Sequence, residues 1–482
     1  MTENKKSNEG LTAKKEENFS EWYQQLILKA ELAGYTSVSG CIVFRPTAWQ
    51  IWEKIRDEVD KRLKKINVKN VYFPLFIPES LLKKEQEHVK GFSPEVAWVT
   101  QAGNTKLQER LAIRPTSEAI MYESYSKWIR SWRDLPLKYN QWSNVVRWEF
   151  KHPIPFFRTR EFVFNEGHTA FATKQEAEKE AIQIINIYKE ILEDYLAIPG
   201  IIGKKTDKEK FAGAEYTLTI ESYLPNGKAI QGPDFHHDGQ NFAKAYNIKF
   251  KTKDEKEEYV WQNTWAISTR MLGVMFALHS DNKGVVLPPQ VAQNKIVIVP
   301  ISSEKDKKIL DQSKKIFKQL SKYDPILDDR SEVTPGFKFH EWELKGIPIR
   351  IEIGPKDLKS KQAVIIRRDT SEKKITKITN LQKQIDLTLK EIQNNLFNKA
   401  NKLLKNALDK SDNLKDTLNK LQKQKLVLVP LKNSTKAEEL LQEKFKGAKT
   451  LNMPLKQPPI KGKKCITTNQ PADYWVYVGK SY

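Results

Sequence analysis

The chain has 482 residues, and its 82 Lys and Arg against 60 Asp and Glu give a formal net charge of +22 at pH 7. This length predicts two to four domains with a large core, which excludes an isolated small module. The positive excess favours a polyanionic partner such as a nucleic acid, although a general Lys-rich bias explains part of it.

Cysteine content and hydropathy narrow the class of protein. Two cysteines, Cys41 and Cys465, exclude a disulfide framework and fit a reducing compartment. No apolar run reaches the roughly 20 residues that span a bilayer, so we expect no membrane anchor. Residues 1–18 lack the apolar region of a secretory signal and predict a short, mobile, charged tail. We therefore expect a cytoplasmic protein.

The first structured region predicts two helices and a strand. Apolar residues recur at helical spacing from residue 19, with Gly34 as the predicted stop, and again over residues 46–63 after Arg45 and Pro46. The run NVYFPLFIP, residues 70–78, predicts an edge strand broken by Pro74. This helix and strand are either plain core or a dimerisation element.

A helix is predicted to begin within RPTSE, residues 114–118. Thr116 or Ser117 is a candidate N-cap, and Glu118 then is an acid that the helix dipole favours in the first turn. The alternative is functional: the Thr116 hydroxyl and the Glu118 carboxylate could bind an ammonium group of a ligand.

Residues 145–167, VVRWEFKHPIPFFRTREFVFNEG, predict two paired strands joined by a loop that Pro153 and Pro155 keep out of the ladder. A strand would place Arg147 and Glu149 on one face, with Arg158 on the loop above. A fixed guanidinium beside a carboxylate suits a polyphosphate and a base. An ordinary Arg–Glu pair on a sheet is equally compatible with this stretch alone.

The next segment predicts a helix over residues 174–196 and then a hairpin that turns at Asn226-Gly227. The sequence His236-His237-Asp238 suggests a metal, but no second cluster lies at ligand spacing, so a metal site is disfavoured. Gln231 and His236 are better candidates for hydrogen-bonding groups of a pocket.

Residues 263–289 predict a strand, an apolar helix from about Met271 and a closing loop. Arg270 would lie at the junction of strand and helix, where unpaired backbone N–H groups favour an anion.

A second domain begins with the strand KIVIVPI, residues 295–301, and a helix over residues 309–320. Two further strand regions are expected in FKFHEWELKGIPIRIEIG and KQAVIIRRD, which predicts a compact α/β domain. A helical pattern then runs from Ile375 to Ala407, and the strand KLVLVPL, residues 425–431, opens a small C-terminal unit.

The motifs RPTSE, VVRWEF with FRTREF, FAGAEYT, IQG with HHDGQNF, and STRMLGV resemble those of prolyl-tRNA synthetases of the archaeal/eukaryote-type branch, which are class II aminoacyl-tRNA synthetases. The resemblance covers residues 19–482. It implies an α+β catalytic domain with an antiparallel sheet of six to seven strands (19–292), an α/β anticodon-binding domain (293–400) and a small α/β C-terminal domain (401–482). It also implies a homodimer formed through residues 45–78, and ligation of proline to tRNA(Pro) with ATP and Mg²⁺.

The resemblance also assigns site residues. Proline is expected at Thr116, Glu118, His236, Phe211 and Phe164. ATP is expected at Arg147, Glu149, Arg158, Gln231, Ser268 and Arg270, with Glu149 at the adenine, and Arg147 and Arg270 as the catalytic residues. The anticodon is expected near Phe339, Glu343, Arg350 and Lys356. Position 164 holds Phe where the family usually has Trp, and position 234 holds Asp where Thr is usual.

Two absences are expected. Many relatives of this type hold zinc with four Cys in the C-terminal domain, whereas the matching positions here are about Lys432, Ala437, Cys465 and Thr467, so we expect no zinc. Bacterial-type members carry a large editing insertion between the second and third motifs, and here the predicted strands account for most of that interval.

Two other functions remain to be weighed. A sister synthetase for threonine would want metal ligands in the pocket, which the sequence lacks. A synthetase-like protein that binds tRNA without activating an amino acid would not need the ATP residues Arg147, Glu149, Arg158 and Arg270. ATP–pyrophosphate exchange with proline, and with threonine as the control, separates the three.

Overall fold

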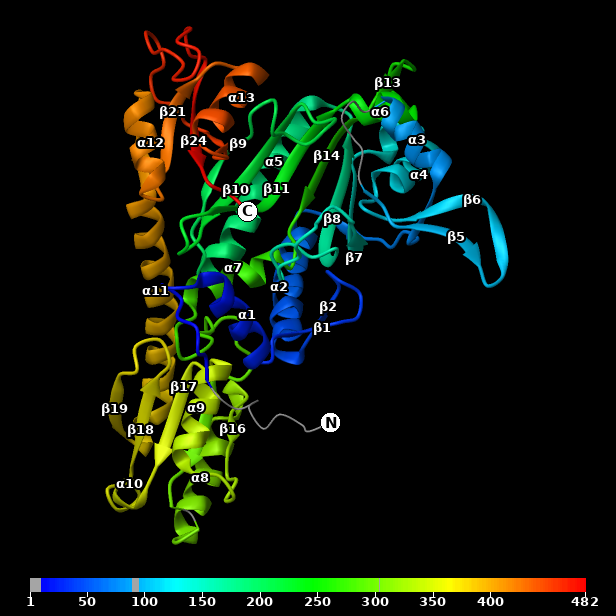
Figure 1. Ribbon diagram of the computed structural model, residues 1–482. Coiled ribbons are helices and arrows are strands. Elements are labelled where there is room, and N and C mark those ends of the chain that lie inside the picture. Colours follow the sequence, from blue (N-terminus) through cyan, green and yellow to red (C-terminus); the bar gives the residue numbers. More distant parts are fainter. Residues whose placement is uncertain (1–9, 89–94, 303) are drawn as a thin grey trace.

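The computed structural model describes residues 10–88, 95–302 and 304–482 (Figure 1). A large sheet and its helices form the body, and the long helix α11 (Leu381–Ala407) runs along the body from the second domain to the C-terminal domain. Within the described chain, no helix is both long and apolar enough to cross a membrane. Residues 1–9 of the expected tail lie outside the described residues, whereas Lys15 Nζ donates to the Ser280 carbonyl (2.7 Å) and fixes the next segment to the body.

The central sheet is almost entirely antiparallel. In the described residues its order is β23–β9–β10–β11–β14–β8–β7–β3, and the short β3–β7 contact is parallel. Because β23 belongs to the C-terminal domain, seven of these strands come from the first domain, within the expected six to seven. The strands are β3 (Lys69–Asn70), β7 (Leu137–Val146), β8 (Glu161–Phe171), β9 (Ile201–Lys204), β10 (Tyr216–Tyr223), β11 (Ala229–Gly239), β14 (Trp261–Ala266) and β23 (Met453–Pro454).

Helix α5 (Lys174–Glu190), extended by a π-helical turn at Ile191–Tyr195, packs on one face of this sheet. The main hydrophobic core continues from α5 into α1 (Phe19–Lys29), α2 (Pro46–Lys65) and α7 (Arg270–His279). Helix α2 begins at Pro46, as predicted, because the first helical turn has no partner for the N–H that proline lacks. The predicted stop at Gly34 is wrong by several residues: Gly34 lies in β1 (Ala33–Tyr35), which pairs with β2 (Ile42–Phe44).

A second core lies at the other end of the sheet, around Phe73, Tyr122, Tyr125 and Phe242. The predicted strand 70–78 is split, since β3 joins the edge of the central sheet and β4 joins β6 in a separate sheet that ends in a projecting hairpin (Figure 1). The elements here are β4 (Phe76–Pro78), α3 (Glu79–His88), β5 (Trp98–Ala102), β6 (Thr105–Ile113), α4 (Glu118–Trp128), α6 (Asn241–Tyr246), β12 (Lys249–Lys251) and β13 (Glu257–Tyr259).

The second domain has a mixed sheet, in the order β16–β15–β17–β18–β19 within the described residues, with helices packed on it. One expected strand is wrong: residues 337–345 lie in helix α9, which begins after the N-cap Thr334 and ends at Gly346 with φ +81°. Its elements are β15 (Ile296–Pro300), α8 (Lys307–Gln319), β16 (Ile326–Leu327), α9 (Pro335–Lys345), β17 (Ile349–Ile353), α10 (Pro355–Lys359), β18 (Gln362–Arg367) and β19 (Lys373–Lys377).

The predicted long helix begins later than expected, because Ile375 lies in β19 and α11 starts at Leu381. After α11, a small sheet in the order β20–β21–β24–β22 forms the C-terminal domain. Its elements are β20 (Leu408–Lys410), α12 (Leu414–Gln422), β21 (Leu426–Leu431), α13 (Thr435–Lys444), β22 (Lys449–Thr450) and β24 (Tyr474–Gly479).

Candidate functional site

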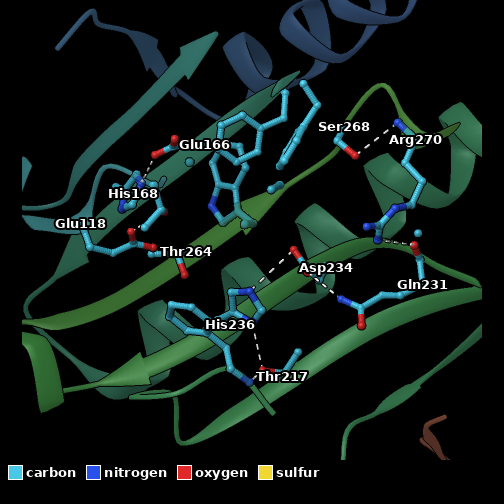
Figure 2. Close-up of a pocket in the computed structure, with 18 of the residues that line it drawn as sticks. Glu118, Glu166, His168, Thr217, Gln231, Asp234, His236, Thr264, Ser268 and Arg270 are labelled. Carbon is cyan, nitrogen blue, oxygen red and sulfur yellow. Dashed lines mark hydrogen bonds and ion pairs between the residues drawn. The ribbon is translucent and has the colours of Figure 1, made fainter. Parts of the chain in front are cut away.

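A pocket lies on the face of the central sheet that α5 does not cover (Figure 2). Side chains alternate between the two faces of a strand. Asn263 turns to α5 and donates to the Ala177 carbonyl (2.9 Å), and His237 contacts Asn263. The adjacent residues, His236 and Thr264, therefore face the pocket. Many of the residues predicted from sequence line it: Thr116, Glu118, Arg147, Phe164, Phe211, Gln231, His236, Ser268 and Arg270.

One end of the pocket carries a buried carboxylate. Glu118 is the first residue of α4, and the Thr116 hydroxyl donates to its Oε2. The capping alternative is not observed, because Ser117 at the N-cap position makes no side-chain cap and instead accepts from Gln141 Nε2 (3.1 Å). A buried carboxylate with a hydroxyl beside it suits an ammonium group.

Aromatic rings form the walls at this end. Phe211 stacks on His236 with ring centroids 4.5 Å apart, and Phe164 is buried against Phe162. These rings form a small apolar wall beside the Glu118 carboxylate. A compact aliphatic ring would fit against this wall.

A β-bulge decides which residues of β11 reach the pocket. Thr219 pairs with Asp234 and Glu221 with Gln231, so three steps along β11 face two steps along β10. The extra residue brings Gln231 and Asp234 to the same side. Within the bulge a Cβ at Gly232 would lie 2.8 Å from the Ile220 carbonyl oxygen, so only glycine fits.

The opposite end of the pocket is cationic. Arg147 Nε donates to the Pro115 carbonyl (2.9 Å), and Arg270 donates to the carbonyls of Phe157 (3.1 Å) and Gln231 (3.3 Å). Burial, with Arg147 and Arg158 nearby, lowers the pKa of Arg270. Crowded guanidinium groups that repel each other form a site that a polyanion stabilises. As predicted, Arg270 lies where β14 gives way to α7.

Two predicted ATP residues are placed differently. Strand β7 ends at Val146, so the argument that a strand puts Arg147 and Glu149 on one face is wrong. Glu149 is exposed, and neither it nor Arg158 is among the lining residues; Arg158 instead lies over the Phe150 ring at 5.6 Å. The Pro-containing loop ends the ladder between β7 and β8 at Val146, earlier than the apolar pattern of the sequence indicates.

Several lining residues were not predicted. Glu166 and His168 contact each other (3.2 Å), and the period of two that runs back to Phe162 and Phe164 along β8 could have identified them. Trp265 could not have been found in this way. The Trp265 indole packs against β8 at Gly167, where a Cβ would lie only 2.1 Å from the ring. This contact joins two strands that are distant in sequence.

Three of the predicted anticodon residues gather in the second domain. The Arg350 guanidinium lies over the Phe339 ring (4.1 Å) and 3.5 Å from Glu343 Oε1. Lys356 is exposed on α10 and is not part of this cluster. In the described chain, no ion pair or hydrogen bond joins its side chain to Phe339, Glu343 or Arg350.

The C-terminus returns to the first domain. The Tyr482 ring packs on Phe157 (centroids 5.0 Å), its hydroxyl accepts from Asn226 Nδ2 (2.8 Å), and its N–H donates to the Ala229 carbonyl. Phe157 also accepts from Arg270, so the chain end supports the cationic end of the pocket.

Known families match all three domains. The profile described as "tRNA synthetase class II core domain (G, H, P, S and T)" matches residues 98–279, "Anticodon binding domain" matches 295–386, and "Prolyl-tRNA synthetase, C-terminal" matches 414–482.

Similar curated proteins share nearly the whole length. The cytoplasmic proline–tRNA ligase of Arabidopsis thaliana is 43% identical over 483 residues, which cover 98% of this chain and 91% of the relative. Proline–tRNA ligase 2 of Bacillus thuringiensis is 45% identical over 471 residues (97% and 98%). The proline–tRNA ligase of Natranaerobius thermophilus is 47% identical over 407 residues (84% and 83%).

Proposed function

Because the chain belongs to the prolyl-tRNA synthetase family of class II aminoacyl-tRNA synthetases, we propose that it attaches L-proline to tRNA(Pro) with ATP. One observation carries the proposal: a single pocket joins the buried Thr116–Glu118 pair to the guanidinium groups of Arg147 and Arg270. Proline-dependent ATP–pyrophosphate exchange and charging of tRNA(Pro) test it. Exchange with threonine but not proline would identify the sister synthetase, and no exchange at all would favour a tRNA-binding protein.

The reaction has two steps. A carboxylate oxygen of proline attacks the α-phosphorus of ATP, pyrophosphate leaves, and a hydroxyl at the tRNA 3′ end then attacks the prolyl carbonyl as AMP leaves. Glu118 and Thr116 would hold the secondary ammonium, and His236, Phe211 and Phe164 the ring. Catalysis then rests on positioning and on charge stabilisation by Arg147 and Arg270, because the reaction needs no protein nucleophile.

The ATP residues follow the same geometry. Gln231 and Ser268 lie beside Arg270 at the cationic end, where the phosphates and ribose would lie. Arg158 and Glu149 lie on the loop that follows β7 and would contact the nucleotide only if ATP draws that loop toward the pocket. A solved complex with ATP tests the placement.

Mg²⁺ would enter with the nucleotide. This ion keeps several waters and takes one or two protein oxygens together with substrate phosphates. In residues 10–88, 95–302 and 304–482, no group of three or more His, Cys, Asp or Glu could hold a metal alone. That arrangement fits a cation bound through ATP, whose charge would add to that of Arg147 and Arg270.

A homodimer in the cytoplasm completes the proposal. The relative from Arabidopsis thaliana is named cytoplasmic. The region predicted to form the dimer, residues 45–78, exposes the large apolar side chains Tyr72 (74%) and Phe76 (45%), which a partner copy would cover. Sedimentation at the mass of one 56.0 kDa chain would contradict the dimer.

Editing of alanyl-tRNA in cis is predicted to be absent. Residues 172–260 contain α5, three strands of the central sheet, α6 and the β12–β13 hairpin. This content supports the absence of an editing domain in that interval. A small difference in ring or chain size gives only about 10–200-fold discrimination by binding. The measurement is deacylation of alanyl-tRNA by the purified enzyme, and fast hydrolysis would refute the prediction.

Anticodon binding is assigned to the second domain. Glu343→Ala is predicted to lower charging of wild-type tRNA by about 1–3 kcal/mol in kcat/KM, because a side chain that reads a base edge discriminates by that amount, while proline-dependent exchange without tRNA stays unchanged. Lys356→Ala should lower charging without changing base preference. If either variant charged wild-type tRNA and anticodon-mutant tRNA at the same rates as the parent enzyme does, the assignment would be wrong.

The C-terminal domain is predicted to bind no zinc. Positions 437, 465 and 467 lie together, where Cys465 Sγ contacts the Thr467 hydroxyl (3.3 Å) and that hydroxyl donates to the Ala437 carbonyl (3.1 Å). One thiolate cannot supply the four ligands of a structural zinc site, so the apolar core around Val427, Leu441 and Val476 must stabilise this domain. Elemental analysis showing about one zinc per chain would overturn the prediction.

A further inference from the structure

The carboxylate of Asp234, which has no role in the sequence-based assignment, lies between the two ends of the pocket. It lies between His236, at the aromatic end, and Gln231, beside Arg270 (Figure 2). Asp234 Oδ2 accepts from Gln231 Nε2 (2.9 Å), and Asp234 Oδ1 lies 3.6 Å from His236 Nε2. Both distances follow from β11 itself, because residues 234 and 236 share a face and the bulge adds residue 231.

The contacts of the imidazole indicate which ring nitrogen carries the proton. Thr217, which pairs with His236 across the strands, accepts the Phe211 N–H through Oγ1 (3.0 Å) and lies 2.9 Å from His236 Nδ1. Its hydroxyl hydrogen is thus available to Nδ1. A carboxylate only accepts, so Nε2, which faces Asp234, carries the proton of the neutral ring. Burial lowers the pKa of His236 and favours that neutral form.

We propose that Asp234 is a positioning residue: its carboxylate holds His236 as the Nε2–H tautomer and holds the Gln231 amide, and so sets the proline and ATP ends of the pocket together. The inference rests on the proposed function. Arg270 donates to the Gln231 carbonyl (3.3 Å), so the chain of contacts runs from Phe211 through Asp234 to the catalytic guanidinium. The role requires one acceptor oxygen toward each of two donors, and a carboxylate has two such oxygens whereas an amide has one.

Asp234→Asn tests the role because it keeps the size and removes the second acceptor. In that variant Gln231 Nε2 still donates to the amide oxygen, which leaves the amide NH₂ facing His236. We expect the imidazole proton to move to Nδ1. The ¹⁵N spectrum of histidine-labelled protein at pH 8 reports this, with the His236 signal identified by its loss in His236→Gln. An unchanged Nε2–H signal in D234N, or an Nδ1–H signal in the parent protein, overturns the proposal.

Exchange kinetics give a second readout. D234N should raise the KM for proline by about tenfold, with a smaller change in kcat, because the His236 imidazole loses the acceptor that holds it. The KM for ATP should change less, because the amide oxygen still accepts from Gln231 Nε2. In the His236→Gln background, D234N should leave the KM for proline within about twofold, since contacts in one network are not additive. An equal effect on the proline KM in both backgrounds would contradict the role.

The controls separate this proposal from the others. Asp254→Asn makes the same chemical change at an exposed residue between β12 and β13 and should match the parent protein. If D234N does not fold by circular dichroism, D234S removes the charge with a smaller side chain and takes its place in both experiments. A parent protein that shows no exchange with proline would refute the proposed function, whereas the ¹⁵N spectrum would still decide the role of Asp234.

Discussion

Arg147→Ala is expected to abolish proline-dependent ATP–pyrophosphate exchange while the protein stays folded. Arg147 lines the cationic end of the pocket and is fixed there by its bond to the Pro115 carbonyl. As phosphate oxygens gain negative charge in the transition state, a fixed guanidinium contributes about 2.7–4 kcal/mol, by analogy with donors of oxyanion sites, or roughly 10²–10³ in rate. Neither the central sheet nor its core depends on this side chain, so the melting temperature should stay within a few degrees of the parent.

The matched control for that experiment is Arg133→Ala. Arg133 is exposed, stacks on Trp132 (4.7 Å) and is not among the residues that line the pocket, so its loss changes the net charge equally without removing a pocket residue. If folded Arg147→Ala retains exchange close to that of Arg133→Ala, Arg147 does not act on the nucleotide and its assignment is lost.

Glu118→Gln is expected to reduce kcat/KM for proline by roughly 10²–10⁴, which corresponds to the 3–5 kcal/mol lost when one partner of a buried ion pair is removed. Glu118 is 4% exposed, so water cannot replace the carboxylate beside a secondary ammonium. The KM for ATP should change little, because Glu118 lies at the opposite end from Arg270. The Thr116 hydroxyl can still donate to the amide oxygen, so the fold should be retained.

Glu123→Gln provides the control on the same helix. Glu123 is half exposed and pairs with Lys127 (3.0 Å) on the outer side of α4, so its neutralisation should cost less than about 1 kcal/mol and leave both KM values unchanged. An equal rise in the KM for ATP and for proline in Glu118→Gln would show that Glu118 supports the whole pocket instead of the ammonium group.

Local chemistry in the chain predicted much of the fold. Pro46 marks the start of α2, Asn226-Gly227 turns the hairpin between β10 and β11, and Arg270 begins α7, because each depends on backbone preferences of a few adjacent residues. The cap residues Thr334, Pro335 and Gly346 also indicate helix α9, so the strand expected there is wrong.

Of the site residues, some could be identified from motifs and others could not be placed from the sequence. The motifs identify Thr116, Glu118, Arg147, His236 and Arg270, and the pocket brings them together. Glu149 could not be placed from the strand pattern, because a Pro-containing loop ends β7 at Val146. How far a ladder continues depends on its partner strand as much as on its own residues.

The sequence by itself determined which residue types face a ligand, since a period of two assigns each strand residue to a face of the sheet. Only the tertiary structure decided how those faces meet. The extra residue in β11 turns Gln231 toward Asp234, and Trp265 crosses β8 at Gly167, two strands almost a hundred residues apart in the chain. Such contacts depend on register and on side-chain volume between distant strands, which no local pattern encodes.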